Sequence, residues 1–222
     1  MKNILIIAPH PDDEVLGCGG QIKKYSEAGH NVFVLVVSRG TPKYYSEVKI
    51  DNVRKEAKNA HVILGVEETF FFDFHAPELD TVSKSEISKA ISEIIQKLQI
   101  HTVFLPHRGD IHHDHTAVFN AGLVAARPVG GCNVKEIYCY ETLSETEWAA
   151  PFGDDAFIPS RFVNITKQFE AKQEAMSCFK SQLKAFPNSR SLETIEALAK
   201  FRGATIGVER AEAFMTVRTI EL

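Results

Sequence analysis

The sequence has few of the features that mark a secreted, membrane-bound or redox-active protein. Its 222 residues include only four cysteines, which form no C-x-x-C pair and do not have the dense spacing of a disulfide scaffold. No apolar run approaches the roughly 18 to 20 residues that a membrane span needs. The first residues run directly into a strand-like segment without a signal-peptide cleavage pattern. We therefore expect reduced thiols, no nucleophilic cysteine, and a cytoplasmic location.

An excess of charge of one sign is also lacking. The chain has 25 Lys and Arg against 29 Asp and Glu, a net charge of −4. This balance argues against nucleic acid or an anionic membrane as a partner. Internal repeats and linker-like low-complexity segments are missing as well, so we expect one domain over residues 1–222.

Apolar runs alternate with stretches of helical periodicity along most of the chain. We expect strands at 4–8, 32–37, 69–74, 102–105 and 134–140, and helices at 15–28, 48–64 and 115–126 and after the capping-box sequence Ser83-x-x-Glu86. This alternation predicts an α/β fold, a Rossmann-like three-layer sandwich with helices on both faces of a mostly parallel sheet of strand order near 3-2-1-4-5. For the last third we expect a strand at 162–165, helices at 166–185 and 191–201, and an extended segment at 213–220.

Two polar clusters follow strands that are neighbours in this sheet. His10-Pro11-Asp12-Asp13-Glu14 comes directly after the first strand, and His112-His113-Asp114-His115 lies in the loop after the fourth. In strand order 3-2-1-4-5 the loops at these strand ends line the crevice where doubly wound proteins bind ligands. We therefore expect the two clusters to meet in space, although about a hundred residues separate them.

The residue types in these clusters suit a divalent metal. Two imidazoles and one carboxylate match the donor preferences of zinc or iron, and three ligands leave a coordination position open for catalysis. Of Asp12 and Asp13, one is expected to ligate and the other to act as general base. Asp is also a favoured helix N-cap, so capping is the alternative role for either residue and for Asp114.

A glycine-rich segment within the first expected helix does not fit a nucleotide fingerprint. In Gly17-Cys18-Gly19-Gly20 the G-x-G-x-x-G pattern fails at Ile22, and the glycines lie inside the helix rather than in the turn before it. We expect them instead to allow a close approach of this helix to the sheet or to the site loop.

These motifs resemble those of a known family. His10-Pro11-Asp12-Asp13-Glu14, preceded by Ala8-Pro9, resembles the opening motif of the PIG-L/LmbE-like zinc deacetylases, and Asp110-Ile111-His112-His113-Asp114-His115 is similar to their second motif. Arg54-Lys55-Glu56 resembles the helix between the two motifs. The stretch from Arg190 through Arg202-Gly203 to Phe214 also resembles many bacterial members.

The resemblance implies a Zn2+-dependent deacetylase that removes an N-acetyl group from an N-acetylglucosamine-type sugar or its conjugate. The implied zinc ligands are His10, Asp13 and His115, and the implied general base is Asp12. His112, protonated and oriented by Asp114, would stabilise the oxyanion or act as acid, and Arg54 would contact the substrate. The family commonly has proline where this chain has His113, which is expected to face solvent, with a competing metal ligand as the alternative.

Other functions use similar residues. A non-haem iron oxygenase holds its metal with two His and one carboxylate, and a non-catalytic metal- or sugar-binding module needs the same donors; glycosyl transfer is a weaker possibility. For specificity we expect loops 39–50 and 144–160, where Tyr44, Tyr45 and Trp148 suit stacking on a sugar ring or ordinary surface packing. A homo-oligomer is possible, and the acceptor sugar is open.

Overall fold

One seven-stranded sheet organises the protein. The computed structural model describes residues 1–221. Its strands are β1 (Asn3–Ala8), β2 (Asn31–Gly40), β3 (Glu68–Ala76), β4 (Thr102–Pro106), β5 (Glu136–Tyr140), β6 (Arg161–Asn164) and β7 (Ala211–Thr219). They lie in the order β3-β2-β1-β4-β5-β7-β6. The first five are parallel in the predicted order 3-2-1-4-5, and β7 joins β5 and β6 in antiparallel fashion.

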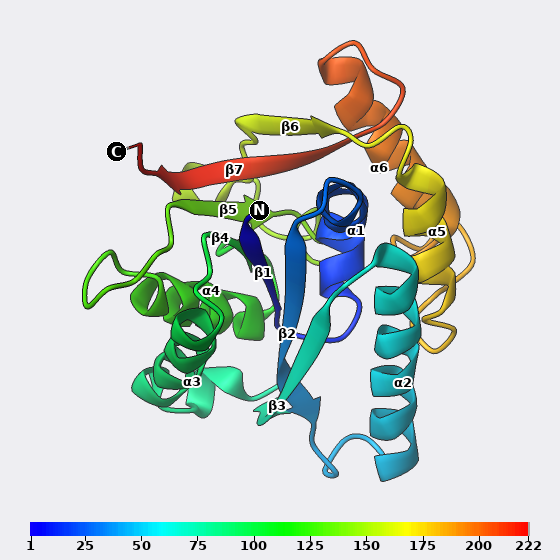
Figure 1. Cartoon of the computed structure of the whole chain (residues 1–222). Helices are drawn as coiled ribbons and strands as arrows, with labels where there is room; N and C mark the ends of the chain where they lie inside the picture. Colours follow the sequence, from blue (N-terminus) through cyan, green and yellow to red (C-terminus); the bar gives the residue numbers. More distant parts are fainter. Residues whose placement is uncertain (222) are drawn as a thin grey trace.

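Helices cover both faces of the sheet. They are α1 (Asp13–Glu27), α2 (Glu47–Leu64), α3 (Lys84–Lys97), α4 (His113–Ala125), α5 (Phe169–Ser177) and α6 (Leu192–Thr205), with short 3-10 turns at Leu79–Thr81 and Gly153–Asp155. Alternate residues of β1 point to opposite faces, as in any strand. Ile4 and Ile6 pack into the core shared with α1, α2, α5 and α6, whereas Leu5 and Ile7 pack into the core shared with α3 and α4. Figure 1 shows these two helical layers on either side of the sheet, so the three-layer α/β sandwich is confirmed.

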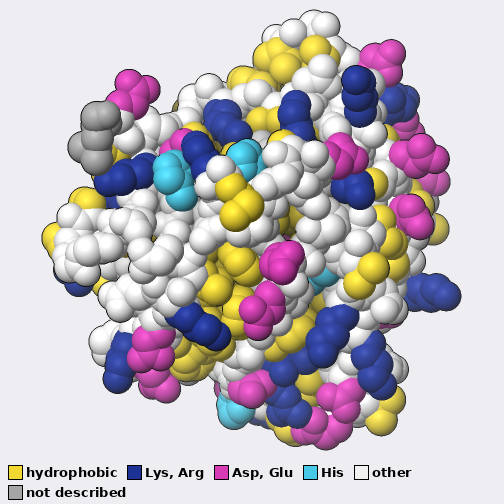
Figure 2. All heavy atoms as spheres, viewed as in Figure 1, with side chains coloured by type: hydrophobic (Ala, Val, Ile, Leu, Met, Phe, Trp, Pro, Cys, Tyr) yellow, Lys and Arg dark blue, Asp and Glu magenta, His cyan; other side chains and the backbone are white. Residues whose placement is uncertain are grey.

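β3 forms one edge of the sheet and is only half covered. Its phenylalanines Phe70, Phe72 and Phe74 pack against the α3 side of the core while remaining partly exposed. Figure 2 shows a hydrophobic area in the middle of the face that it draws, with charged side chains around it. Arg54 of α2 donates to the carbonyl of Phe72 at 2.6 Å. Because this charged side chain occupies a backbone carbonyl of the edge strand β3, it hinders the pairing of a further strand there.

The glycines of α1 allow a close approach, as the sequence predicts. A Cβ on Gly17 would lie 2.2 Å from the Tyr140 ring at the end of β5, and one on Gly20 would lie 2.7 Å from Ile165. α1 therefore packs directly against the end of β5 and the segment after β6. Because α1 begins at Asp13, this packing also fixes the position of the first polar cluster relative to the sheet.

Two predictions about helix ends are wrong. The helix expected at 166–185 is only α5, because Glu56 of α2 accepts the backbone N–H of Ser181 at 3.1 Å and its hydroxyl at 2.5 Å, which draws the chain out of the helix. The Ser83 capping box also does not form. α3 begins after Ser83, but the Ser83 hydroxyl pairs with that of Ser85 at 2.8 Å instead of capping.

The structure describes the helices and the cysteines on which the first expectations depend. None of the helices within residues 1–221 is long and apolar enough to cross a membrane. All four cysteines are unpaired, and Cys18 and Cys139 are buried. Burial raises the pKa of the Cys139 thiol to about 12, which disfavours the reactive thiolate.

Candidate active site

The two polar clusters meet at the carboxyl ends of β1 and β4. These strands pair in parallel, so the loop after β1 and the loop before α4 leave the same edge of the sheet. The ring centroids of His10 and His112 lie 4.5 Å apart, and those of His10 and His115 lie 5.5 Å apart. The convergence predicted from the strand order is therefore confirmed.

His10, Asp13 and His115 form one group of possible metal ligands. A donor atom from each lies within 4.8 Å of the others. Asp13 Oδ2 is 3.4 Å from His10 Nδ1 and 3.3 Å from His115 Nε2. Asp13 and His115 have no exposed surface, so the group is closed on two sides. A second group, His10 with His112 and Asp114, shares His10 and is therefore not an independent site.

Two further carboxylates hold the imidazole rings of this group. Asp114 Oδ2 lies 2.9 Å from His10 Nε2, and Asp110 Oδ2 lies 2.7 Å from His115 Nδ1. A carboxylate on one ring nitrogen fixes the proton there and leaves the other nitrogen to ligate. This arrangement directs His10 Nδ1 and His115 Nε2 toward Asp13.

The donor set fits a divalent cation. Among the described residues, Asp13 Oδ1 and His115 Nε2 are buried without a hydrogen-bond partner, and leaving buried polar atoms unpaired is costly. The surroundings also favour positive charge. Burial opposes protonation of His10, but hydrogen bonds to Asp114 and Asp13 outweigh it and raise its pKa to about 9. Three N and O donors with an open side suit a catalytic zinc site.

Asp12 lies beside this group and faces a different direction. Its backbone has φ 113° in the left-handed region, and its side chain makes no capping hydrogen bond to α1. Asp13 does not cap α1 either, because its Oδ2 accepts the backbone N–H of His10 at 2.9 Å. Burial raises the pKa of Asp12 to about 8, against the opposing charge of Arg190. The helix-capping alternative therefore does not account for the two acids.

The role expected for Asp114 is not the one the structure shows. Its carboxylate contacts His10 and the backbone N–H of Leu79, the latter at 2.9 Å, rather than the His112 ring. Only the backbone N–H of Asp114 reaches His112, donating to Nδ1 at 3.2 Å. His112 is thus the N-cap of α4, and Asp114 is a partner of His10, one of the candidate metal ligands.

The surroundings of His112 oppose the protonated form that the resemblance implies. Burial and the nearby charge of His10 lower its pKa to about 4, and the amino end of a helix disfavours a cation. With Nδ1 accepting a hydrogen bond, the neutral ring carries its proton on Nε2. These surroundings favour the neutral ring, with an Nε2–H that can donate a hydrogen bond. His113, in contrast, is 80% exposed at its side chain and lies in neither metal group, as expected.

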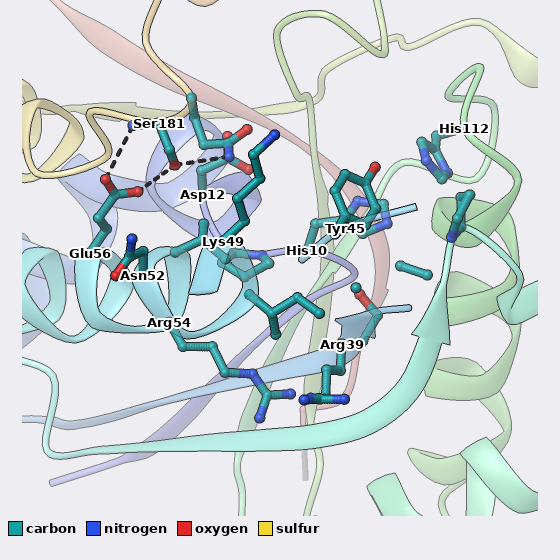
Figure 3. A pocket seen from close by; sticks show the side chains of 18 of the residues that line it. His10, Asp12, Arg39, Tyr45, Lys49, Asn52, Arg54, Glu56, His112 and Ser181 are labelled. Carbon is teal, nitrogen blue, oxygen red and sulfur yellow. Dashed lines mark hydrogen bonds between the residues drawn. The ribbon is translucent and has the colours of Figure 1, made fainter. Parts of the chain in front are cut away.

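A cavity of about 460 Å³ opens beside the metal group. Figure 3 shows its lining: His10 and His112 lie at one side, Glu56 and Ser181 at the other, and Arg39 and Arg54 near β3. Arg54, which we expected to contact the substrate, lies in the cavity wall and donates to Asp73 at 2.8 Å. Tyr45 lines the cavity, whereas Tyr44 and Trp148 do not. Loop 39–50 therefore supplies most of the expected specificity wall, and loop 144–160 supplies Glu145.

Arg190 is a residue of the site for which the sequence indicated no role. Its Nη1 is 3.4 Å from Asp12 Oδ2, its Nη2 is 3.4 Å from Glu145 Oε1, and its Nε donates to Ser144 Oγ at 2.7 Å. These contacts hold a positive charge beside the candidate base. The sequence indicated Arg190 only as the start of the C-terminal stretch that resembles bacterial relatives. Its contact with Asp12 could not be predicted, because the two residues lie far apart in the chain.

Known proteins are similar to this chain over most of its length. Residues 5–126 match the PIG-L family, described as GlcNAc-PI de-N-acetylase. The uncharacterized deacetylase YaiS of Escherichia coli (strain K12) is 30% identical over 186 residues, which cover 81% of this chain and 91% of that protein. The diacetylchitobiose deacetylase of Thermococcus kodakarensis is 29% identical over 193 residues, covering 82% and 70%. The crystal structure of the conserved protein TT1542 of Thermus thermophilus has a TM-score of 0.81 at 25% identity, covering 100% and 97%.

Proposed function

The chain belongs to the PIG-L deacetylase family, and on that premise we propose that it is a zinc-dependent hydrolase of an N-acetylglucosamine-type sugar or sugar conjugate. The observation that carries the proposal is the group of His10, Asp13 and His115, with two buried donor atoms unpaired among the described residues. A candidate base and a cavity lie directly beside this group. The products of the reaction are acetate and a free amine.

We assign the metal to the donors that point toward one another. His10, Asp13 and His115 would hold it, with Asp114 and Asp110 fixing the two imidazoles. A bound zinc ion supplies Lewis acidity and lowers the pKa of a bound water toward 7. The open side of the ligand group faces the cavity, because His10 also lines that cavity.

The chain's own residues account for the proton transfers. Asp12 lies in the cavity wall and accepts a proton from the attacking water, and it then returns that proton to the leaving amine nitrogen. The Nε2–H of His112 donates a hydrogen bond to the oxygen that gains negative charge during attack. Arg190 remains beside Asp12 and balances its charge while it is ionised.

The cavity supports a polar substrate of sugar size. Its volume falls in the usual range for small-ligand sites, and the wall away from the metal group carries Asn52, Glu56, Ser181 and Gln182. These side chains are suited to hydrogen bonds with hydroxyl groups. Arg54 completes this wall beside α2, and we propose that it contacts the substrate. The name of the Thermococcus kodakarensis relative supports an acetylated amino sugar.

An amine-release screen tests the proposal. Zinc-loaded protein is incubated with acetylated amino sugars, their conjugates and sugar nucleotides, and free amine is measured with and without prior chelation. We expect turnover that chelation abolishes and that zinc or cobalt restores. Full activity in metal-free protein would overturn the proposal. Metal binding without any turnover would favour a binding module, and iron-dependent oxygen consumption would favour an oxygenase.

A further inference from the structure

Asp12 has an unusual backbone conformation that its neighbours must hold. Its φ of 113° and ψ of −27° lie in the left-handed region, which a residue with a side chain adopts only when its surroundings hold it there. On the carbonyl side the conformation is fixed by helix α1, because the Asp12 carbonyl accepts the N–H groups of Val15 and Leu16 at 3.0 and 2.9 Å. The amide side needs a separate restraint.

Glu14 provides that restraint. Its Oε2 accepts the backbone N–H of Asp12 at 3.1 Å. Its Oε1 lies 2.9 Å from Nε2 of His61, which belongs to α2. Glu14 and His61 are 0% and 2% exposed, and neither lines the cavity. The pair therefore acts on Asp12 from beneath the site.

The hydrogen bonds continue to the sheet and have one consistent direction. His61 Nδ1 lies 2.8 Å from Thr69 Oγ1 on β3. Because an ionised carboxylate only accepts, Nε2 of His61 donates to Glu14, and Nδ1 accepts from the Thr69 hydroxyl. Every polar atom of the chain from Thr69 to the Asp12 amide is thereby used. Such buried and fully satisfied networks are rigid.

We infer that Glu14 and His61 are positioning residues, which hold Asp12 in the left-handed conformation that turns its carboxylate into the cavity. The inference rests on the proposed function, because it takes Asp12 as the base. It goes beyond it by assigning a task to two buried residues that contact neither substrate nor metal. A displacement of about 1 Å at a catalytic group costs up to about 10²-fold in rate, so this network has a kinetic consequence.

The alternative is that the pair only ties α1 to α2. In that case its loss would lower stability and leave the turnover of folded protein unchanged. The variants His61→Phe and His61→Gln separate the two possibilities. Phenylalanine keeps an aromatic ring and removes both hydrogen bonds, whereas a glutamine amide donates to Glu14 and accepts from Thr69. Leu64→Ala is the matched control, because Leu64 is a fully buried residue of the same helix that belongs to its core-facing side.

The kinetic test compares kcat and KM in folded protein with full metal content. For His61→Phe we expect kcat to fall about 10- to 100-fold with KM within about twofold, and for His61→Gln we expect recovery of most of the loss. Leu64→Ala should lower the unfolding midpoint and keep kcat. An unchanged kcat in metal-loaded His61→Phe would overturn the inference. If His61→Phe does not fold, Thr69→Val replaces it in the test. This variant removes only the hydrogen bond between Thr69 and His61, and we expect kcat to fall in it as well.

A second measurement does not depend on catalysis. In 15N-labelled protein the Asp12 amide proton should resonate downfield and exchange slowly, because it donates to a buried carboxylate. In His61→Phe this resonance should move upfield and exchange faster, and in Leu64→Ala it should stay. If wild-type protein deacetylates no acetylated sugar, the proposed function fails and the amide resonance alone decides the positioning role. An Asp12 resonance that does not respond to His61→Phe would overturn that role even in an active enzyme.

Discussion

Asp12 and Asp13 are neighbours in the chain, but their carboxylates have different surroundings. Asp13 lies between His10 and His115 and is fully buried. Asp12 lines the cavity and faces Arg190. The left-handed backbone at Asp12 turns the two side chains apart. A single turn of chain thus places one acid among the candidate metal ligands and the other in the wall of the cavity.

This difference predicts distinct behaviour for the two asparagine variants. Asp12→Asn leaves His10, Asp13 and His115 unchanged, so zinc content should remain near one per chain while turnover falls about 10²- to 10⁴-fold, the usual contribution of a positioned general base. Asp13→Asn replaces a carboxylate ligand with a weaker amide ligand. Its zinc content should drop, and excess zinc should restore part of the turnover. Elemental analysis beside amine release measures both quantities.

The result that would reverse this assignment is equally specific. Loss of zinc in Asp12→Asn together with retention in Asp13→Asn would exchange the two roles. Normal zinc and normal turnover in both variants would return the acids to a merely structural role, since asparagine has the same backbone-capping ability as aspartate.

At this scale the meeting of the two polar clusters was predictable, because strand order alone places both loops at one edge of the sheet. The specific ligand set of His10, Asp13 and His115 came from the resemblance to the deacetylase motifs. The contact of Asp114 with His10 depends on how a ring is turned in space, and the resemblance placed Asp114 on His112 instead. Asp110 was part of the second motif, but its bond to His115 Nδ1 became evident only in three dimensions.

At the scale of elements, helix α1 begins at the turn of Asp12 and Asp13, and its glycines let it pack closely against the sheet. The five parallel strands and the helices between them were predictable, because buried strands have continuous apolar runs and helices have apolar residues on one face. The length of α5 was not. It depends on Glu56, 125 residues from Ser181, capturing the chain that leaves the helix. Long-range capture of this kind leaves no local pattern in sequence.

Gly17 provides a test of the contact between α1 and the sheet. Alanine is favoured over glycine within a helix by about 1 kcal/mol. A Cβ at this position would nevertheless meet the buried Tyr140 ring at 2.2 Å. Gly17→Ala should therefore lower the free energy of unfolding, by about 1 to 3 kcal/mol for an overpacked site. Urea unfolding of the variant and the wild type measures the change.

The Tyr140 ring itself supplies the control. In a Tyr140→Leu background the added methyl group of Gly17→Ala meets a smaller side chain. The cost of Gly17→Ala should then be smaller than in the wild type, because residues in contact do not have additive effects. Equal costs in both backgrounds would show that the ring is not what excludes a side chain at position 17.

At the scale of the whole molecule, one buried ion pair links α5 and β7 and also contacts the first helix, α1. Lys172 of α5 lies 2.7 Å from Glu212 of β7, and both side chains are almost fully buried, at 5% and 4% exposure. Lys172 also donates to the carbonyl of Leu16, and Glu212 accepts the backbone N–H groups of Gly20 and Gln21. The pair therefore contacts the backbone of α1 at Leu16, Gly20 and Gln21 and ties this helix to the C-terminal strand.

Removal of one member of this pair should destabilise the whole fold. Lys172→Met leaves the Glu212 carboxylate buried without its cation, and breaking a buried pair in this way costs about 3 to 5 kcal/mol. The free energy of unfolding in urea should fall by that amount in a single transition, because α1, α5 and β7 are held by the same two side chains. Lys200→Met is the matched control. Lys200 pairs with Glu196 on the surface of α6 with 59% of its side chain exposed, and such a pair contributes little to stability.

The double variant Lys172→Met/Glu212→Gln separates the attraction within the pair from the penalty of an unpaired charge. If the penalty dominates, removing the second charge should restore part of the stability that Lys172→Met loses, because no uncompensated charge then remains in the core. The amide oxygen introduced by Glu212→Gln would still accept a backbone N–H of α1. A double variant that is less stable than Lys172→Met by the full cost of Glu212→Gln alone would show that the two side chains act independently. In that case α1 would be tied to β7 by the hydrogen bonds of Glu212 to Gly20 and Gln21, and the ion pair itself would be incidental to the fold.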